Sequence, residues 1–216
     1  MLRSVALSTL LVASAFAAIG FDTRRRVDQA HFTCIAANES TTFFIGQIWD
    51  ENGRYDTQGI NNLKNAVATN YKIDGLFLPC LRKTCAHASN QFEAAVNRLT
   101  QENVKVDTIW IGIARGEWHD DHTINQQVTT DIIAQADKMN QKVGFHTNQR
   151  EWEGTMGGNF NAAAAKPLWW AHHDNTPGMG NFTAFAGWTA PAMHQYEGER
   201  ERDCGGQVRI QLDFRP

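Results

Sequence analysis

The apolar positions of this chain fall into two alternating patterns, which predict strands and helices in succession. Stretches with helical periodicity, such as the one containing Phe92, Val96 and Leu99, would place their apolar residues on one face of a helix. Between such stretches lie short apolar or alternating runs typical of buried strands, at residues 18–22, 42–49, 73–79, 106–113, 142–147, 167–171, 188–195 and 207–214. This order predicts an α/β fold with parallel strands joined by right-handed crossovers.

The number of these runs favours a closed barrel. About eight strands in a chain of 216 residues, without a long linker, fit one TIM-like (β/α) barrel domain. A doubly wound open sheet is the alternative, but no glycine-rich dinucleotide-binding motif follows the first strand. In a barrel, we expect the functional residues at the carboxyl ends of the strands.

The first residues have the features of a secretory signal peptide. Arg3 precedes an apolar run, Val5 to Phe16, that is too short to span a bilayer, and Ala15-Phe16-Ala17 fits the cleavage pattern. A buried N-terminal strand is the alternative. We therefore expect residues 1–17 to be a signal peptide and residues 18–216 to form a secreted, extracellular barrel that does not enter a membrane.

Secretion changes the interpretation of the four cysteines. An even number of cysteines in an oxidising compartment indicates disulfides. Cys80 and Cys85 close a short loop and are the natural local pair, which leaves Cys34 to bond with Cys204. A zinc site is the alternative, although the spacings fit no standard zinc finger.

The charged and polar surface excludes one class of partner. The net charge of −3 is not that of a nucleic-acid-binding protein, which usually carries a basic field. Arg24-Arg25-Arg26 is a local basic run that we interpret as a solvated surface. Two sequons, at Asn38 and Asn181, predict N-glycosylation of a secreted surface.

The sequence gives little support to a metal or cofactor. His119-Asp120-Asp121-His122 and His172-His173-Asp174 have the composition of metal sites, but a loop or helix start explains them equally well. Neither a G-x-S-x-G elbow nor a P-loop is present. We therefore predict no metal and no cofactor.

Tryptophans and carboxylates point toward glycan chemistry. Indole faces stack on sugar rings, yet they also fill barrels, and adjacent strand residues such as Trp169 and Trp170 face opposite ways, so at most one can line a cleft. Glycoside hydrolysis needs two carboxyl groups flanking the scissile bond. Asp22 ends the first strand, but the run at 108–115 ends without an acid. The strands alone therefore indicate a binding barrel.

Several motifs follow one another in an order that is specific to a known family. They are Gly20-Phe21-Asp22, Asp74 to Cys80, Thr108-Ile109-Trp110, Lys142-Val143-Gly144 with Thr147-Asn148, Pro167 to Ala171, Gly187-Trp188-Thr189 and His194-Gln195-Tyr196. Through them nearly the whole mature chain resembles the invertebrate, nematode-type branch of glycoside hydrolase family 25 lysozymes. The resemblance implies a modified (β/α) barrel and hydrolysis of the bond between muramic acid and glucosamine in peptidoglycan.

The functional positions of that family are mostly changed in this chain. Asp22 keeps the first-strand acid, whereas the fourth-strand D-x-E pair falls on Gly112 and Ala114. The last-strand Asp falls on Gln211, and the Asn two residues further on is Asp213. A positioned general acid contributes about 10²- to 10⁴-fold to the rate, and alanine cannot carry a proton. The resemblance therefore implies a defective catalytic apparatus.

The predicted substrate-binding residues lie near the strand ends and in the family motifs. They are His146, which stands at a family tyrosine position, Asn148, Trp169, His194 and Gln195.

We expect a monomeric pseudoenzyme that binds peptidoglycan or a related amino-sugar polymer in antibacterial defence or digestion. A weak muramidase using Asp22 with Glu117 or Asp213 is the first alternative. A scaffold that acts through its outer helices is the second.

Overall fold

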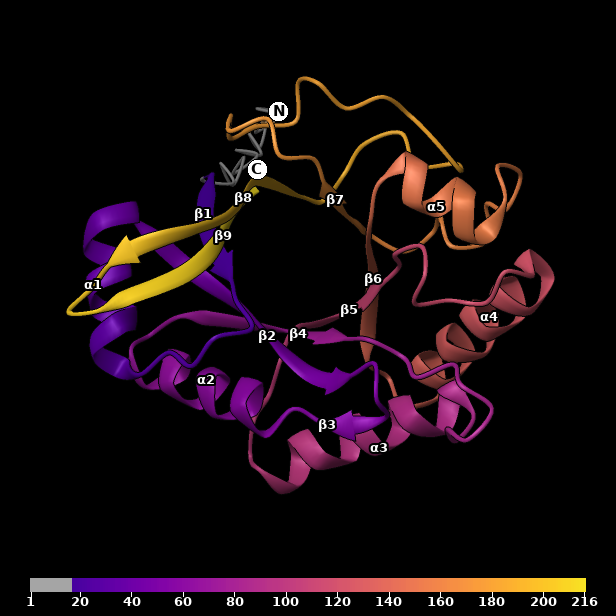
Figure 1. Ribbon diagram of the computed structural model, residues 1–216, viewed down its shortest axis with the longest axis horizontal. Helices are drawn as coiled ribbons and strands as arrows, with labels where there is room; N and C mark the ends of the chain where they lie inside the picture. Colours follow the sequence, from indigo (N-terminus) through magenta and orange to yellow (C-terminus); the bar gives the residue numbers. More distant parts are fainter. Residues whose placement is uncertain (1–16) are drawn as a thin grey trace, which may run out of the picture.

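The computed structural model describes residues 17–216 and shows a closed barrel (Figure 1). The strands follow one another around the sheet as β1-β9-β8-β7-β6-β5-β4-β2, and pairing of β1 with β2 closes the ring. The short strand β3 extends the sheet beyond β2. The predicted (β/α) barrel is confirmed, whereas the predicted signal peptide, apart from Ala17, lies outside the described residues.

The elements run along the chain as β1 (Ala18–Asp22), α1 (Gln29–Glu39), β2 (Thr41–Asp50), β3 (Arg54–Tyr55), α2 (Thr57–Ala68), β4 (Lys72–Phe77), α3 (Ala88–Gln101), β5 (Thr108–Gly112), α4 (His122–Lys138), β6 (Lys142–Thr147), α5 (Gln149–Met156), β7 (Leu168–Ala171), β8 (Met193–Asp203) and β9 (Gln207–Arg215). The helices lie outside the barrel, over its first strands (Figure 1). Among residues 17–216, no helix is both long enough and apolar enough to cross a membrane.

The sheet departs from the predicted all-parallel arrangement at its last strand. Apart from the short β3, which is antiparallel to β2, neighbouring strands from β1 through β8 are parallel, but β9 is antiparallel to both β8 and β1. Only Cys204, Gly205 and Gly206 separate β8 from β9. A connection that short can join only antiparallel strands, whereas a parallel pair needs a long crossover.

The other differences from the predicted elements occur where the apolar signal is weak. The run predicted at 188–195 is a strand only from Met193 onward, and Trp188 instead forms a turn with Phe185. Strand β8 continues to Asp203 through charged, mostly exposed residues, because this hairpin projects from the barrel. Helix α5 was not predicted, since eight residues are too few for a clear stripe.

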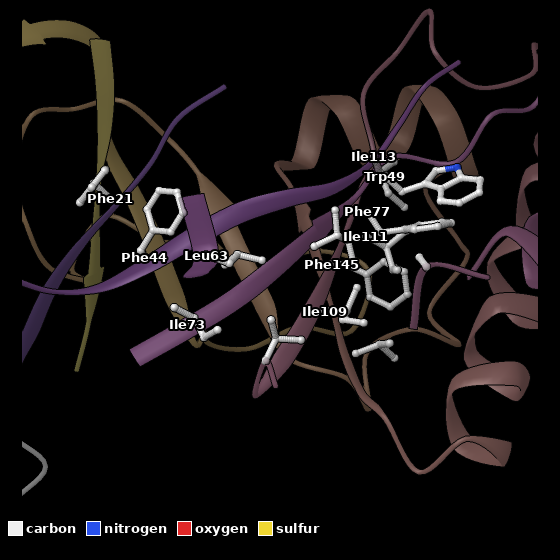
Figure 2. Packing of buried hydrophobic residues seen from close by; sticks show 14 of the residues in the cluster. Phe21, Phe44, Trp49, Leu63, Ile73, Phe77, Ile109, Ile111, Ile113 and Phe145 are labelled. Atoms are coloured by element: carbon white, nitrogen blue, oxygen red, sulfur yellow. The ribbon is translucent and has the colours of Figure 1, made fainter. Parts of the chain in front are cut away.

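The strand side chains form two apolar layers, because successive residues point to opposite faces. Side chains that point outward, including Phe44, Phe77 and Phe145, pack in the layer that contains Leu63 of α2 and Phe92 of α3 (Figure 2). The inward side chains form a separate cluster: Phe43, Ile45, Leu76, Leu78, Trp110, Trp169 and Met193. These side chains fill the interior of the barrel toward the amino-terminal ends of its parallel strands. A site can therefore form only at the opposite end, where those strands end.

A buried ion pair closes the amino-terminal end of the barrel. Asp74 of β4 accepts hydrogen bonds from the backbone N–H of Thr108 at 3.2 Å and from Trp110 Nε1 at 2.8 Å. It is also paired with Arg215. The Arg215 guanidinium lies 4.1 Å from the centre of the Phe43 ring. These contacts tie the last strand to the barrel opposite the functional end.

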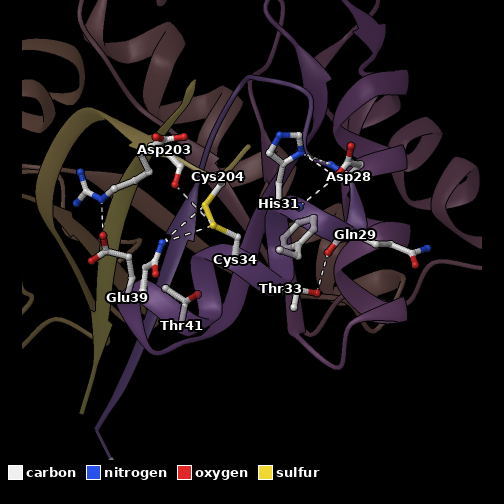
Figure 3. Close-up of a disulfide and its surroundings, with 12 residues drawn as sticks. Asp28, Gln29, His31, Thr33, Cys34, Glu39, Thr41, Asp203 and Cys204 are labelled. Atoms are coloured by element: carbon white, nitrogen blue, oxygen red, sulfur yellow. Dashed lines mark hydrogen bonds and ion pairs between the residues drawn. A yellow bond between two sulfur atoms is a disulfide. The ribbon is translucent and has the colours of Figure 1, made fainter. Parts of the chain in front are cut away.

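Two disulfides have the predicted pairing. Cys34–Cys204 joins α1 to the turn between β8 and β9 (Figure 3), and Cys80–Cys85 closes a short loop after β4. The first bond links residues 170 positions apart. It therefore fixes the projecting hairpin to the first helix.

Candidate active site

A pocket of about 420 Å³ opens at the carboxyl ends of the strands. Its lining includes Asp22 from the end of β1, Gln195 from β8 and Gln211 from β9. His146 of β6 and Ala114, just beyond β5, also line it. Asp22, His146 and Ala114 meet here because they lie at or next to the carboxyl ends of their strands, and Gln195 and Gln211 pair with the last residues of β7 and β1.

Gln195 connects the polar groups at the floor of the pocket. Its Nε2 donates to Asp22 Oδ2 at 2.7 Å and to Gln211 Oε1 at 3.0 Å. Its Oε1 lies 3.3 Å from His146 Nε2 and 3.0 Å from His173 Nε2. Since an amide oxygen only accepts, both histidines donate through Nε2. The amide of Gln195 is fully used in organising its neighbours and holds Asp22 in place.

His146 presents a neutral ring to the pocket. Burial lowers the pKa of His146 to about 4, so the imidazole is uncharged near neutral pH. The ring lies on the indole of Trp169, with centres 3.8 Å apart. Because Nε2 carries the proton, Nδ1 is a free acceptor, and no residue described by the structure donates to it.

Asp22 is a buried carboxyl with an altered acidity. Burial raises its pKa to about 7, and the hydrogen bonds from Gln195 and Asp213 only partly oppose this effect. Asp213 is completely buried behind it and does not line the pocket. The alternative in which Asp213 acts directly on substrate beside Asp22 is therefore corrected, because Asp213 has no surface to offer.

Two predicted substrate contacts support the pocket from behind. Trp169 has no exposed surface, and its Nε1 donates to Asp213 Oδ1 at 2.8 Å. His194 is 1% exposed. Its Nδ1 lies 2.6 Å from the backbone oxygen of Gly178, and its Nε2 lies 2.6 Å from the backbone oxygen of His172. The prediction that these two side chains touch substrate is corrected: their polar atoms and surfaces are already occupied.

Asn148 lies at the pocket wall, as predicted, and begins helix α5. Its side-chain oxygen accepts from the backbone N–H of Glu151 at 3.0 Å and so caps the helix. The amide nitrogen of Asn148 remains available to a ligand. Glu151 also lines the pocket, and it was missed. The Asn-x-x-Glu spacing at 148–151 is the capping signal that could have revealed it.

The positions of the family acids face the pocket but carry no carboxyl group. Gly112 and Ala114 both line it. A Cβ atom at Gly112 would lie 2.3 Å from Leu78 Cδ2, so Leu78 occupies the space that a side chain would need. Position 112 therefore has neither an acid nor the space for one. Ala114 is partly exposed, so a longer side chain could be accommodated there.

This packing predicts a penalty for any side chain at position 112. We expect Gly112→Ala to lower the free energy of unfolding by about 1–3 kcal/mol, as overpacking in a filled core does. Denaturant unfolding measures the loss. Gly158→Ala is the matched control, because nothing lies within 4 Å of its Cβ position. Equal stability of the two variants would contradict the packing argument.

The motifs with metal-site composition have structural explanations. Asp121 caps helix α4, where its side chain accepts from the N–H of Thr123 at 2.8 Å. Among the residues that the structure describes, no three His, Cys, Asp or Glu side chains form a group that could hold a metal ion. The sequon residues Asn38 and Asn181 are both exposed, and their glycosylation remains a prediction.

Comparisons with known proteins agree with this geometry. A family model described as "Lysozyme-like protein 1" matches residues 13–196. Lysozyme-like protein 5 of Caenorhabditis elegans is 31% identical over 198 residues, which cover 91% of each chain. Probable GH family 25 lysozyme 4 of Dictyostelium discoideum is 26% identical over 196 residues, covering 90% of this chain and 88% of that protein.

A solved structure shares the fold. The structure of a family GH25 lysozyme from Aspergillus fumigatus superposes with a TM-score of 0.68 at 14% identity, over 93% of this chain and 94% of that one. The family model covers β1 through the first residues of β8, which include Asp22, His146 and Gln195 of the pocket. The chain therefore belongs to the lysozyme-like proteins of glycoside hydrolase family 25.

Proposed function

We propose that this protein binds peptidoglycan or a related amino-sugar polymer and has lost efficient hydrolysis. One observation carries the proposal: a pocket opens at the carboxyl ends of the barrel strands, and Gly112 and Ala114 line it where the family resemblance leads us to expect the catalytic acid pair. Without a proton donor to the leaving oxygen, cleavage loses about 10²- to 10⁴-fold. Binding does not depend on that proton.

The groups that remain in the pocket suit an uncharged sugar. His146 Nδ1 offers an acceptor, Asn148 Nδ2 offers donors, and Asp22 offers carboxyl oxygens. Hydroxyl and acetamido groups of an amino sugar match this mixture of donors and acceptors. Pockets of this kind gain their specificity from a few fixed polar groups, and the hydrogen bonds of Gln195 fix two of the three.

We include secretion in the proposal. The signal-like segment at 1–17 and the pair of disulfides are both typical of exported proteins. A monomeric, extracellular protein that recognises bacterial walls would act in antibacterial defence or in digestion.

Binding is tested by sedimentation of the purified protein with insoluble peptidoglycan, with cellulose as the comparison polymer. We expect saturable binding to peptidoglycan only. His146→Phe keeps a ring on Trp169 but removes the hydrogen bonds, so we expect it to weaken binding about 2- to 10-fold. His87→Phe is the control, because His87 lies on the surface before α3. Absence of saturable wild-type binding would overturn the proposal.

A weak muramidase is the second candidate, and Glu117 is the observation that favours it. Glu117 lines the pocket, and desolvation raises its pKa above the ordinary value, as a general acid requires, although much of the residue is exposed. On this account, Glu117→Gln abolishes a measurable release of reducing ends from peptidoglycan. If the wild type and Glu117→Gln release equal amounts, Glu117 is not the acid.

A further inference from the structure

Asp213 is a fully buried acid of β9 that the proposed function does not yet use. It lies on β9 opposite Gly20, and Asp22 lies opposite Gln211, so the two aspartates belong to adjacent strands. Asp213 has no exposed surface. Its Oδ1 accepts from Trp169 Nε1. Its Oδ2 is buried and has no hydrogen-bond donor among the described residues.

The carboxyl group of Asp22 can supply the missing donor. The side chains of Asp22 and Asp213 lie within hydrogen-bonding range of each other. Two ionised carboxylates have only acceptors, so such a contact requires a proton on one of them. Asp22 Oδ2 already accepts from Gln195. The geometry therefore gives Asp213 Oδ2 a partner only when the pair is protonated once.

The surroundings do not neutralise a second charge on the pair. Arg24 acts on Asp22 from the exposed segment after β1, but Glu199 of β8 opposes it. Arg215, the cation acting on Asp213 from its own strand, is already paired with Asp74. From β6 and the segment after β7, His146 and His173 face the site through Gln195. Burial of two like charges is costly in such a setting.

We propose that Asp213 is a positioning residue that shares one proton with Asp22, so that the pair carries a single negative charge and accepts hydrogen bonds from an uncharged amino sugar. This inference rests on the proposed function for its ligand, but not for the shared proton. The family resemblance places an asparagine at position 213. The aspartate is therefore a feature of this chain that changes the charge state of the retained family acid.

The shared proton determines how binding depends on pH. Asp22 ionises first, with a pKa that burial raises to about 7, whereas burial and the Asp22 charge hold the pKa of Asp213 well above its ordinary value. For a ligand that needs the singly charged pair, affinity therefore rises about tenfold between pH 6 and pH 8, as Asp22 ionises. Asp213→Asn keeps a donor for Asp22, so it should show the same rise, and only the wild type should lose affinity again at higher pH, when Asp213 ionises.

The direct test is a titration of aspartate side-chain carboxyls by carbon-13 NMR, without ligand, in the wild type and in Asp213→Asn. We expect two wild-type signals to titrate above the ordinary range, Asp22 first and Asp213 at a higher pH. In Asp213→Asn, we expect the higher of the two signals to disappear, while the pKa of Asp22 stays raised, because Asp22 remains buried and the asparagine amide can still donate to it. Asp203→Asn is the matched control, because it removes one exposed acid from β8. Ordinary titration of Asp213 in the wild type would overturn the proposal.

A second readout follows unfolding, so it does not depend on glycan binding. Because the folded pKa of Asp22 is raised from 3.8 to about 7, the folded state loses stability as the pH rises through this interval. Asp213→Asn should lose less. Equal pH dependence in both proteins would contradict the shared proton. The sedimentation experiment remains the separate test of the proposed function, so the two ideas fail independently.

Discussion

Placing glutamate at position 114 and aspartate at position 211 is expected to raise the rate of peptidoglycan cleavage by about 10²- to 10⁴-fold. Ala114 lines the pocket that Asp22 also lines, and it is partly exposed, so a longer side chain has room to reach the glycan. Gln211 already contacts the same amide as Asp22. The double variant Ala114→Glu with Gln211→Asp therefore restores an acid and electrostatic support. Release of reducing ends measures the gain.

Two controls separate chemistry from changes in shape. Ala114→Gln with Gln211→Asn has the same size but no acid, and it should remain inactive. Asp22→Asn in the restored chain should remove the gained activity, because it removes the retained carboxylate. Gly112 is left unchanged, since Leu78 fills the space beside it. If the restored chain folds and binds peptidoglycan but does not cleave it, loss of these carboxyls is not what limits activity.

Asp74→Ala is expected to lower the free energy of unfolding by about 3–5 kcal/mol, as removal of one member of a buried ion pair does. The substitution leaves the Arg215 guanidinium without its carboxylate. It also removes the acceptor of Trp110 Nε1 and of the Thr108 N–H. The N–H groups of Thr108 and Trp110 are buried and would be left without a partner, whereas the partly exposed Arg215 can reach water. Denaturant unfolding followed by circular dichroism measures the loss.

A surface ion pair provides the comparison for Asp74. Asp107 pairs with Lys142 at 2.9 Å, but their side chains are 68% and 72% exposed. Solvent screens that pair, so Asp107→Ala should cost no more than about 1 kcal/mol. Similar losses for Asp74→Ala and Asp107→Ala would show that the buried pair does not hold the amino-terminal end of the barrel together.

The sequence predicted those parts of the fold that leave a periodic apolar signal. The runs at 18–22 and 142–147 coincide with β1 and β6. The charged half of β8 and the short helix α5 leave no such signal, so neither was predicted. The order of β9 between β8 and β1 depends on a three-residue turn, which apolar periodicity does not report.

The site was predictable in its positions but not in its contacts. Asp22 and His146 lie at or next to strand ends, Gln195 pairs with the last residue of β7, and the structure brings all three to the pocket. The burial of Trp169 and His194 depends on residues packed over them from distant segments. The contact between Asp22 and Asp213 depends on the register of two strands at opposite ends of the chain. Those relations arise only when the barrel closes.

We propose that the binding pocket persists in this protein without efficient hydrolysis. The most direct measurement incubates wild-type protein and Asp22→Ala with purified peptidoglycan, and records both sedimented protein and released reducing ends. We predict saturable wild-type sedimentation, with a release of reducing ends no greater than that of Asp22→Ala. A wild-type release that continues with time and disappears in Asp22→Ala would contradict the claim and identify a working lysozyme.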